Sequence, residues 1–411
     1  MVIDVHCHYT FSRRPATTAE RFSFESPAAP AGDPPLPTAF DSCVSPRATA
    51  RFNWRIARRV LHMPPPGAAA DAWLEAGYAR HLLAATTPSA AATLPRPLPG
   101  REGRLGPPQP LPEREGSSGA IDRFVLLAFD AVHDDDGRCP PLPQPRDRLG
   151  SDIYTSNSLV RAACRQHSDR FLFGASVHPY RRDAVACLDE VFAGGACLLK
   201  WIPLHHNIAL DDPRTRAVLR RCAELGLPLL IHCGEEYTLT TQCPHLKSIR
   251  PLLAVLRELR RKEQMPTVIV AHAATAVTPW GDDGSHRLLL DALTGEFADS
   301  PLYADISALV TWPKAPHLRR LAQRQELHHK LLFGSDFPVP PSVWRVRREL
   351  GREYAPVCAI PSWPGRAAAA CRALGFNEIV FHRAATLLPH VDYFAPAPQA
   401  TPGRTLSCGP S

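Results

Sequence analysis

Two histidines stand one residue apart at the end of the first apolar run, in Asp4-Val5-His6-Cys7-His8. Side chains alternate along a β-strand, so His6 and His8 point to the same side of it. Two imidazoles at that spacing suit a divalent metal ion. A His-x-His pair alone is common by chance. Its place at the end of a first strand, ahead of a very long connection, favours a metal site.

Three further polar side chains occupy equivalent places. His232, His272 and Asp336 are each the first strongly polar side chain after a later apolar run. One such residue could be a satisfied polar group at the end of a strand. Imidazole and carboxylate groups at equivalent positions on four strands instead indicate a metal site at one end of a sheet.

The elements that position these residues are short apolar runs separated by helical patterns. Near-continuous apolar runs are typical of parallel strands buried on both faces. Their alternation with helices predicts an α/β fold, a (β/α)₈ TIM barrel, over an open doubly wound sheet, because no Gly-rich dinucleotide loop is present. We expect the helices at 183–192, Pro213–Leu225 (ended by Gly226) and 246–262. The eight predicted strands are 2–5, 124–129, 171–177, 196–199, 227–231, 267–271, 301–306 and 330–333.

One connection is abnormally long. About residues 10–120 separate the first two strands, against a usual loop of ~4–6 residues. We expect a single barrel over 1–393 with this insertion bordering the site, because loops after barrel strands lie on the catalytic face. Helices are predicted at 51–62 and 71–86. The Pro/Gly-rich span 88–119 is expected to be flexible and the tail 394–411 disordered.

At this point the motifs resemble a known family, the amidohydrolase superfamily, and within it the amidohydrolase-related group that contains aminocarboxymuconate-semialdehyde decarboxylase. The motifs are Asp4-x-His6-x-His8, Leu199-Lys200-Trp201-x-Pro203, Pro228-Leu-Leu-Ile-His232-x-Gly234, Val270-Ala-His272 and Phe333-Gly-Ser-Asp336-Phe-Pro338.

The resemblance implies that His6, His8, His232 and Asp336 bind Zn²⁺ or another divalent metal such as Mn²⁺. Such a site lowers the pKa of a bound water toward ~7, and Asp336 can take the proton. His272 would then polarise the substrate or bind a second metal. In binuclear relatives a lysine like Lys200 is carboxylated and bridges two ions. We expect an unmodified Lys200 and one ion, with a second ion as the alternative.

Weaker candidates complete the set. His178, at the end of the third strand, is expected to bind substrate or a second metal, or to be structural. Asp305 is expected to orient a ligand histidine. Glu235 and Glu236 follow the fifth strand and are expected to contact either substrate or solvent. The pairs at 205–206 and 328–329 are predicted to lie on the surface.

The composition of the chain indicates which kinds of partner it binds. The net charge of +7 comes from arginines on helical patterns, without a nucleic-acid motif, and no apolar run is long enough to span a membrane. Twelve cysteines without a Cys-x-x-Cys pair indicate a reducing, cytoplasmic setting. The partner is therefore expected to be a small molecule, with a homo-oligomer left open.

Three functions fit these predictions. The first is a hydrolase that uses metal-activated water on a C–N or C–O bond of a small polar substrate. The second is non-oxidative decarboxylation of a small aromatic or unsaturated carboxylic acid. The third is a barrel that binds a ligand without turnover. The hydrolase and the decarboxylase would use the same fold and the same metal site, so the sequence does not distinguish between these two functions.

Overall fold

The computed structural model describes residues 1–9, 42–51, 76–83, 120–140, 143, 145–236, 238–278 and 280–394. Eight strands, parallel to their neighbours, form one sheet in the order β1-β3-β5-β6-β7-β8-β9-β10. Each overlaps one of the eight predicted apolar runs. They are β1 Ile3–His8, β3 Arg123–Leu127, β5 Phe171–Ala175, β6 Ala196–Trp201, β7 Leu229–Ile231, β8 Val268–Val270, β9 Leu302–Asp305 and β10 Leu331–Leu332.

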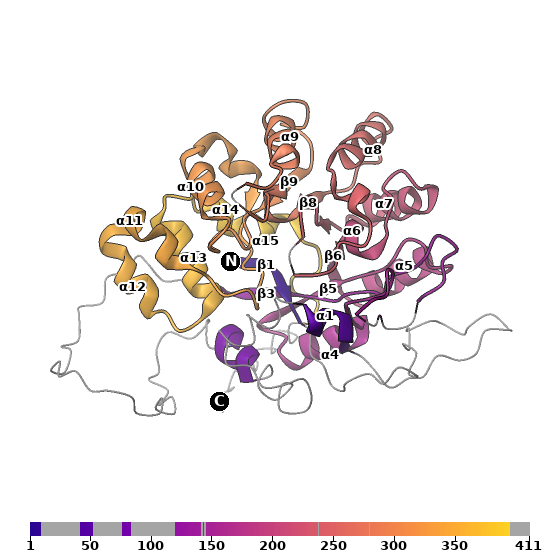
Figure 1. Ribbon diagram of the computed structural model, residues 1–411, viewed down its shortest axis with the longest axis horizontal. Coiled ribbons are helices and arrows are strands. Elements are labelled where there is room, and N and C mark those ends of the chain that lie inside the picture. Colours follow the sequence, from indigo (N-terminus) through magenta and orange to yellow (C-terminus); the bar gives the residue numbers. More distant parts are fainter. Residues whose placement is uncertain are drawn as a thin grey trace, which may run out of the picture.

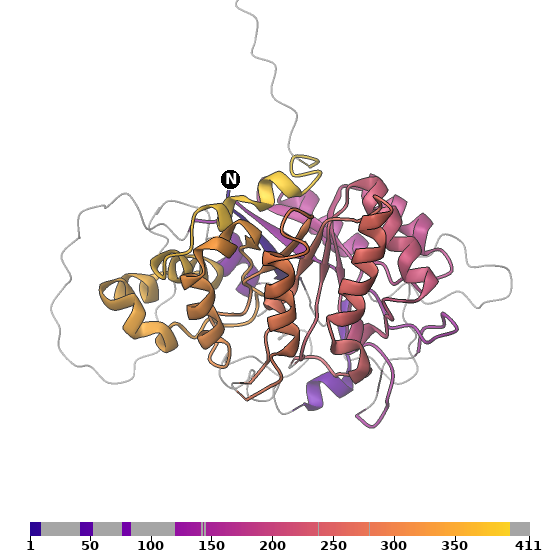
Figure 2. The same ribbon diagram turned by 90° about the horizontal axis from the view of Figure 1, so that it is seen from above.

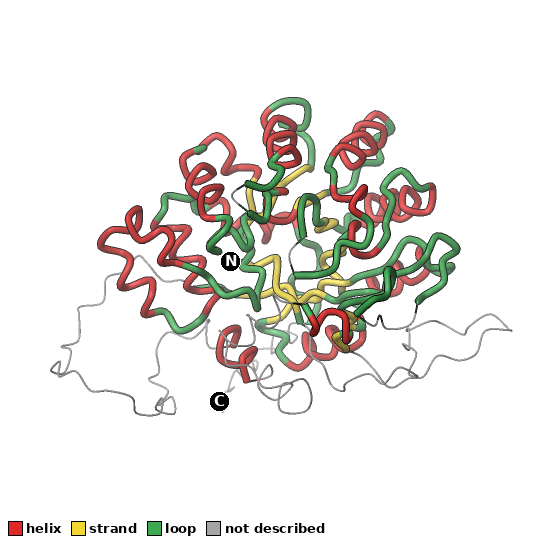
Figure 3. Tube along the Cα trace, in the orientation of Figure 1, coloured by secondary structure: helices red, strands yellow, loops and turns green. Residues whose placement is uncertain are grey.

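The sheet closes on itself between β1 and the chain that follows β10. The backbone N–H of Asp336 donates to the carbonyl of His6 over 2.8 Å, and that of His8 donates to the carbonyl of Phe337, also over 2.8 Å. Helices surround the strands (Figures 1 and 3). The fold is therefore the predicted (β/α)₈ barrel.

The helices follow the strands in alternation, and Figure 2 shows them from above, standing around the sheet. Among the described residues, no helix is both long and apolar enough to cross a membrane. The α-helices are α1 Pro46–Ala50, α4 Asn157–Gln166, α5 Ala184–Ala193, α6 Pro203–His206, α7 Pro213–Leu225, α8 Arg250–Arg261, α9 Gly284–Thr294, α10 Ala315–Gln323, α11 Arg347–Leu350, α12 Tyr354–Ala359, α13 Trp363–Ala373, α14 Ile379–His382 and α15 Ala384–Leu387.

Helix α7 shows how local sequence sets these boundaries. Asp212 accepts a hydrogen bond from the N–H of Arg214 (2.8 Å), and Pro213 occupies the first helical position. Both features are typical of a helix start. Gly226 ends the helix with a left-handed φ of 64°, which glycine adopts at low cost. The helix predicted at Pro213–Leu225 is confirmed.

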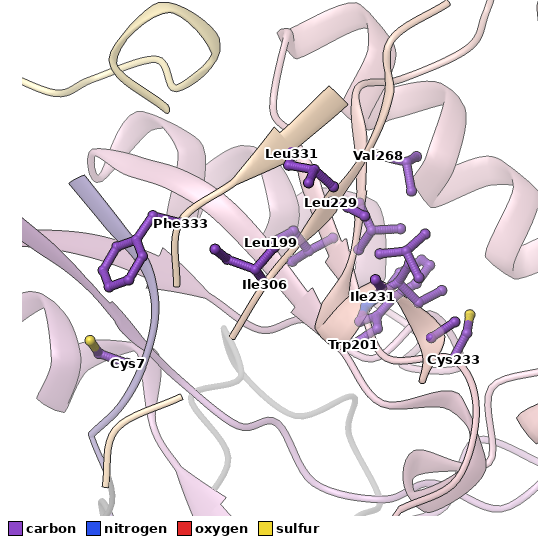
Figure 4. Close-up of a cluster of buried hydrophobic side chains, with 14 of the residues drawn as sticks. Cys7, Leu199, Trp201, Leu229, Ile231, Cys233, Val268, Ile306, Leu331 and Phe333 are labelled. Carbon is purple, nitrogen blue, oxygen red and sulfur yellow. The ribbon is translucent and has the colours of Figure 1, made fainter. Parts of the chain in front are cut away.

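Two apolar layers hold the barrel together, and alternation along the strands divides residues between them. Leu230 packs inside the barrel with residues such as Ile269 and Leu332. Its neighbours Leu229 and Ile231 face outward and join the layer between strands and helices. Part of this outer layer is drawn in Figure 4. The inside of the barrel is therefore packed with apolar side chains.

Strand β1 is irregular where it carries the site. Asp4 pairs with Phe124 and Cys7 with Leu126, so Val5 and His6 together stand opposite the single residue Val125. A bulge of this kind re-aims side chains next to functional sites. Cys7 packs in the outer layer, which leaves His6 and His8 on the inner side, as predicted.

Described pieces of the predicted insertion border the carboxyl end of the barrel. Strand β2 (Ser42–Val44) pairs antiparallel with β4 (Ile153–Thr155). The buried Arg47 guanidinium donates to Asp152 over 2.7 Å and to the carbonyl of Gly150 over 2.7 Å.

The other described piece, 76–83, includes a π-helical turn at Ala79–Leu83, inside the helix predicted at 71–86. The helix predicted at 51–62 (beyond Arg51), the span 88–119 and the tail after Phe394 lie outside the described residues. The division into one barrel, an insertion and a tail stays a prediction.

Candidate metal centre

The donor atoms of His6, His8 and Asp336 converge at the carboxyl end of the barrel. Nε2 of His6 lies 3.3 Å from Oδ1 of Asp336, and Nε2 of His8 lies 3.0 Å from the same oxygen. His6 and Asp336 are buried, and the His8 side chain is 17% exposed. The first and last strands of the barrel thus bring together residues far apart in the sequence.

These distances fit a divalent ion. With metal–donor bonds of ~2.0–2.1 Å in a tetrahedral zinc site, neighbouring donors are roughly 3.3 Å apart. The spacings of 3.3 and 3.0 Å between these imidazole nitrogens and the carboxylate oxygen are close to that value. All three ligand atoms lie within 4.8 Å of one another. The residues present can therefore hold a zinc-type ion.

Gly334 permits this convergence. A Cβ at this position would lie 2.9 Å from Cβ of His6 and 3.0 Å from Cβ of Ser307. Contacts under about 3 Å force a displacement, so only glycine lets the chain after β10 approach His6 this closely. In the Phe333-Gly-Ser-Asp336 motif, Gly334 therefore permits the close approach and Asp336 provides the candidate ligand.

Asp305 and Ser307, on and just after β9, orient His6. Nδ1 of His6 donates to Oδ2 of Asp305 over 2.8 Å, and the Ser307 hydroxyl lies 2.9 Å from the same nitrogen. A proton held on Nδ1 leaves the Nε2 lone pair directed at the cluster, which is the tautomer a metal requires. The predicted role of Asp305 fits this geometry, and the contribution of Ser307 was not predicted.

Burial and neighbouring charged groups together determine which side chains of this cluster are protonated. Burial, reinforced by the nearby Lys200 charge, lowers the pKa of His6 to about 4, so its imidazole is neutral near pH 7. Burial alone would raise the pKa of Asp336, but His272 and His6, with a hydrogen bond from His8, hold it well below its usual value. Neutral imidazoles beside an ionised carboxylate are the forms that bind a divalent cation.

His272 lies beside this group in an unusual backbone conformation, with a φ of 54°. Its Nδ1 donates to the carbonyl of Ser307 over 3.0 Å, which leaves Nε2 with a lone pair, 3.9 Å from Oδ2 of Asp336. His6, His272 and Asp305 also form a second group close enough for an ion. The hydrogen bonds that join them make this a network that orients side chains, because the Nδ1 atoms already carry protons.

His232 does not join the cluster in this conformation. Its Nε2 donates to the carbonyl of Glu235 over 3.0 Å, and Nδ1 lies 3.5 Å from a carboxylate oxygen of Glu236. Its ring centroid is 5.3 Å from that of His272. A role for His232 as a ligand needs a rotation of its side chain and stays a prediction.

Lys200 is completely enclosed at the base of the site. Its Nζ lies 3.2 Å from Nε2 of His6. Burial lowers its pKa to about 8, although Asp305 and Asp336 oppose the shift. The amine is therefore placed beside a predicted metal ligand, as the family motif implies, and its modification stays a prediction.

His178 lies in a separate histidine cluster. Its Nε2 donates to the carbonyl of His206 over 2.6 Å, and its Nδ1 accepts from the N–H of Tyr180 over 3.0 Å. Both ring nitrogens are thus engaged by the backbone, which favours the structural alternative for this residue. Burial lowers its pKa well below the usual value.

The predicted surface positions of three histidines are wrong. His205, His206 and His328 are completely buried or nearly so, and only His329 of the two pairs is exposed. Adjacent histidines resemble a polar surface pair in sequence, but each of the buried three exchanges a ring hydrogen bond with the backbone. A buried polar group is stable when it is hydrogen-bonded in this way.

Aromatic contributions to the site were also missed. Phe129, just beyond β3, stacks on His8 with ring centroids 4.8 Å apart. Tyr78, from the insertion, donates to the carbonyl of His8 and packs against Phe337 at 5.1 Å. Neither residue carries a motif, so only the fold reveals its place.

A barrel with imidazole and carboxylate groups gathered at the carboxyl ends of its strands has the architecture of an enzyme. The amidohydrolase family model matches residues 146–360, just over half of the chain. The chain belongs to the amidohydrolase family. This confirms the resemblance drawn from the motifs.

Solved structures similar to this chain include three from bacteria. An uncharacterised TIM-barrel protein from Bordetella bronchiseptica is 16% identical, with a TM-score of 0.48 over 94% of this chain and 96% of that one. A probable 2-pyrone-4,6-dicarboxylic acid hydrolase from Acinetobacter baumannii is 14% identical, with a TM-score of 0.43 over 94% and 98%. The 2,6-dihydroxybenzoate decarboxylase from Rhizobium is 13% identical, with a TM-score of 0.37 over 62% and 84%. No curated protein matches the chain.

Proposed function

We propose that this protein is a metal-dependent hydrolase that cleaves a C–N or C–O bond of a small polar substrate with water. The convergence of His6, His8 and Asp336 within bonding distance of one divalent ion is the observation that carries the proposal. These residues would hold the ion, with His232 completing the set after its side chain turns. A Zn²⁺-type ion supplies Lewis acidity, which lowers the pKa of water from 15.7 to about 7.

Asp336 and His272 would act on the attacking water or the substrate. Asp336 is ionised, because its pKa is held well below the usual range, so it can accept a proton from the attacking water. His272 keeps an Nε2 lone pair 3.9 Å from Oδ2 of Asp336. Burial holds the pKa of His272 well below its usual value, so its ring stays neutral. The tautomer of His272 therefore supports a role as a hydrogen-bond acceptor, which orients the attacking water or the substrate, over one as a donor.

Lys200 supports decarboxylation as a second candidate. Its pKa of about 8 keeps the amine mainly protonated at pH 7, next to His6. In this reaction the bond between the substrate carbon and its carboxylate breaks, and the electron pair stays on that carbon. Carbon dioxide leaves, and Lys200 can deliver the proton that the carbon then takes up. The same barrel end would serve both reactions.

Metal content and one variant test the proposal. Gently purified protein is expected to hold close to one zinc-type ion by elemental analysis, and protein whose folding and activity ignore added zinc or manganese would contradict it. With a substrate found among small amides, lactones and aromatic carboxylates, Asp336→Asn should lower turnover by about 10²–10⁴-fold, as for a lost general base. Near-normal turnover by a folded, metal-loaded variant would exclude this role of Asp336. The exposed Asp299→Asn is the matched control.

Isotope labelling separates the candidate functions. Oxygen-18 from solvent enters the product of a hydrolase, whereas a decarboxylase releases carbon dioxide and places a solvent proton on carbon. A barrel that binds its ligand without turnover gives neither result. A carbamate on Lys200 bridging two ions would favour hydrolysis and replace the expected single ion.

A further inference from the structure

The chain follows a left-handed turn where it leaves β8. His272, Ala273 and Ala274 have φ angles of 54°, 48° and 51° in succession. The N–H of Thr275 closes the turn by donating to the carbonyl of His272 over 3.1 Å. Residues other than glycine adopt this conformation at a cost, because Cβ approaches the following carbonyl oxygen, and they do so singly rather than in runs. A turn of this kind persists only where its surroundings hold it.

Three neighbouring parts of the barrel hold this turn. From β9, Oδ1 of Asp305 accepts the N–H of His272 over 2.7 Å. After β7, a Cβ at Gly234 would lie 3.0 Å from the carbonyl oxygen of the last residue of the turn, so the two connections pack closely. From α9, Nδ1 of His286 donates to the carbonyl of Ala273 over 2.7 Å. The turn is thus held from three sides, and His286 holds its middle residue.

The ring of His286 is itself fixed in place. It is buried in the first turn of α9. Burial lowers its pKa, so the imidazole is neutral near pH 7, and its single N–H is the one donated to Ala273. The ring contacts that of His317 on α10, with centroids 4.9 Å apart, and Nε2 of His317 lies 3.3 Å from Oδ1 of Asp283. Packing between two helices therefore sets the direction of this hydrogen bond.

The turn begins at the residue that reaches the candidate metal centre. The ring of His272 stacks on that of His6, with centroids 5.0 Å apart and an angle of 21° between the planes. Its Nδ1 donates to the carbonyl of Ser307, and its Nε2 lies 3.9 Å from Oδ2 of Asp336. Because the backbone of His272 is part of the turn, a relaxation of the turn would move this ring.

We propose that His286 is a positioning residue for His272, on which it acts through the carbonyl of Ala273. This inference rests on the proposed function, because it concerns the orientation of a group at the reacting site. Loss of the bond from His286 would leave a buried carbonyl without its donor, and the turn could relax toward an ordinary backbone conformation. Nε2 of His272 would then lose its fixed position relative to Asp336.

Leucine and asparagine at position 286 test this role, because their side chains have nearly the same shape. The amide nitrogen of asparagine can take the place of Nδ1, whereas leucine offers no donor. The control is His328→Leu, which removes another buried histidine whose Nε2 donates to the carbonyl of Leu321 over 3.0 Å. His328 precedes β10, at the amino end of the barrel, so its loss should lower stability without reaching His272.

Nitrogen-15 NMR of the imidazoles and hydrogen exchange of the backbone amides are measured on the full-length protein, as purified and after treatment with a chelator. The wild-type protein should hold the proton of His272 on Nδ1. His286→Leu should show both tautomers of His272 and about 10-fold faster exchange of its N–H, the value of one hydrogen bond. His286→Asn should restore both wild-type results. If His286→Leu does not fold, His286→Gln takes its place, since its amide lies one bond farther from the backbone.

A folded His286→Leu protein with the wild-type tautomer and exchange at His272 would refute the role of His286. The same changes in His328→Leu would also refute it, since they would then report a general loss of stability. Neither readout needs a substrate or a bound metal, so a protein that takes up no zinc would contradict the hydrolase proposal alone. Once a substrate is known, His286→Leu should lower kcat/KM by about 10-fold at normal metal content, and His286→Asn should recover most of it. An unchanged kcat/KM in His286→Leu would overturn the inference.

Discussion

Replacing Asp305 by Asn tests whether the network around His6 prepares it to bind a metal. Oδ1 of Asp305 accepts the backbone N–H of His272 (2.7 Å) and that of Ser307 (3.0 Å), and also the Ser307 hydroxyl. Among the described residues, Oδ2 accepts a hydrogen bond from the Nδ1–H of His6 alone, over 2.8 Å. An asparagine that keeps the three bonds at its oxygen must therefore turn its amide nitrogen toward His6.

This arrangement reverses the tautomer of His6. An amide nitrogen donates a hydrogen bond, so Nδ1 of His6 must give up its proton to accept it, and the proton moves to Nε2. A protonated Nε2 cannot bind a metal. Restoring the metal-binding tautomer breaks the bond to the amide of residue 305 and leaves two buried donors facing each other, which costs about 1–3 kcal/mol. That energy corresponds to roughly a 5- to 150-fold loss of zinc affinity.

Competition with a chromophoric chelator measures the affinity, and nitrogen-15 NMR of the imidazoles reports the tautomer. The expected result is a loss of zinc affinity of that size together with a proton on Nε2 of His6. The exposed Asp299→Asn serves as the control and should change neither quantity. A folded Asp305→Asn protein with wild-type zinc affinity would refute the reasoning, whichever tautomer it shows.

Other predictions concern packing and pH. Gly334→Ala should reduce zinc affinity and lower the free energy of unfolding by about 1–3 kcal/mol, because its Cβ would overlap neighbouring side chains; wild-type values in chelator competition and urea unfolding would contradict this. Burial lowers the pKa of His178 and His206 well below their usual value. Their contribution to stability is complete above the unfolded pKa of ~6.5 and is lost as pH falls, by up to about 1.4 kcal/mol per pH unit for each residue. Urea unfolding of metal-free protein from pH 7.5 to 5 should show the decline, and a flat profile would contradict it. Arg47→Met should let protease cleave near residue 47 sooner than in the wild type, because its buried bonds to the 147–152 loop are lost; an unchanged cleavage rate would show that these bonds do not anchor the segment.

Short-range patterns in the sequence predicted the frame of the site. Apolar runs located all eight strands, because strands buried on both faces are apolar throughout. Alternation placed His6 and His8 on one side, and the polar residue after the last run identified Asp336. The geometry of Asp305 relative to His6 also fits what was expected of it. These residues lie on strands or directly after them, where the backbone direction fixes where a side chain points.

Positions set by loops and distant packing were beyond such patterns. The side chain of His232 follows β7 as predicted but turns to the carbonyl of Glu235. Lys314, immediately before α10, is buried in a connection whose course depends on how that helix packs, and nothing in its local sequence indicates burial. His206 is buried, and its ring accepts a backbone hydrogen bond from Ile202, a contact that sequence spacing does not predict.

The barrel closes between its first strand and the chain after its last one, so residues that meet in the folded protein are synthesised at widely separated times. Asp4 accepts a hydrogen bond from Ser335, 331 residues later in the chain. At a synthesis rate of 5–20 residues per second, roughly 15–70 seconds separate these two residues on the ribosome. During that interval His6 and His8 exist without Asp336. A nascent chain that meets zinc early offers it two imidazoles alone, so the complete centre can form only when synthesis of the barrel is nearly finished.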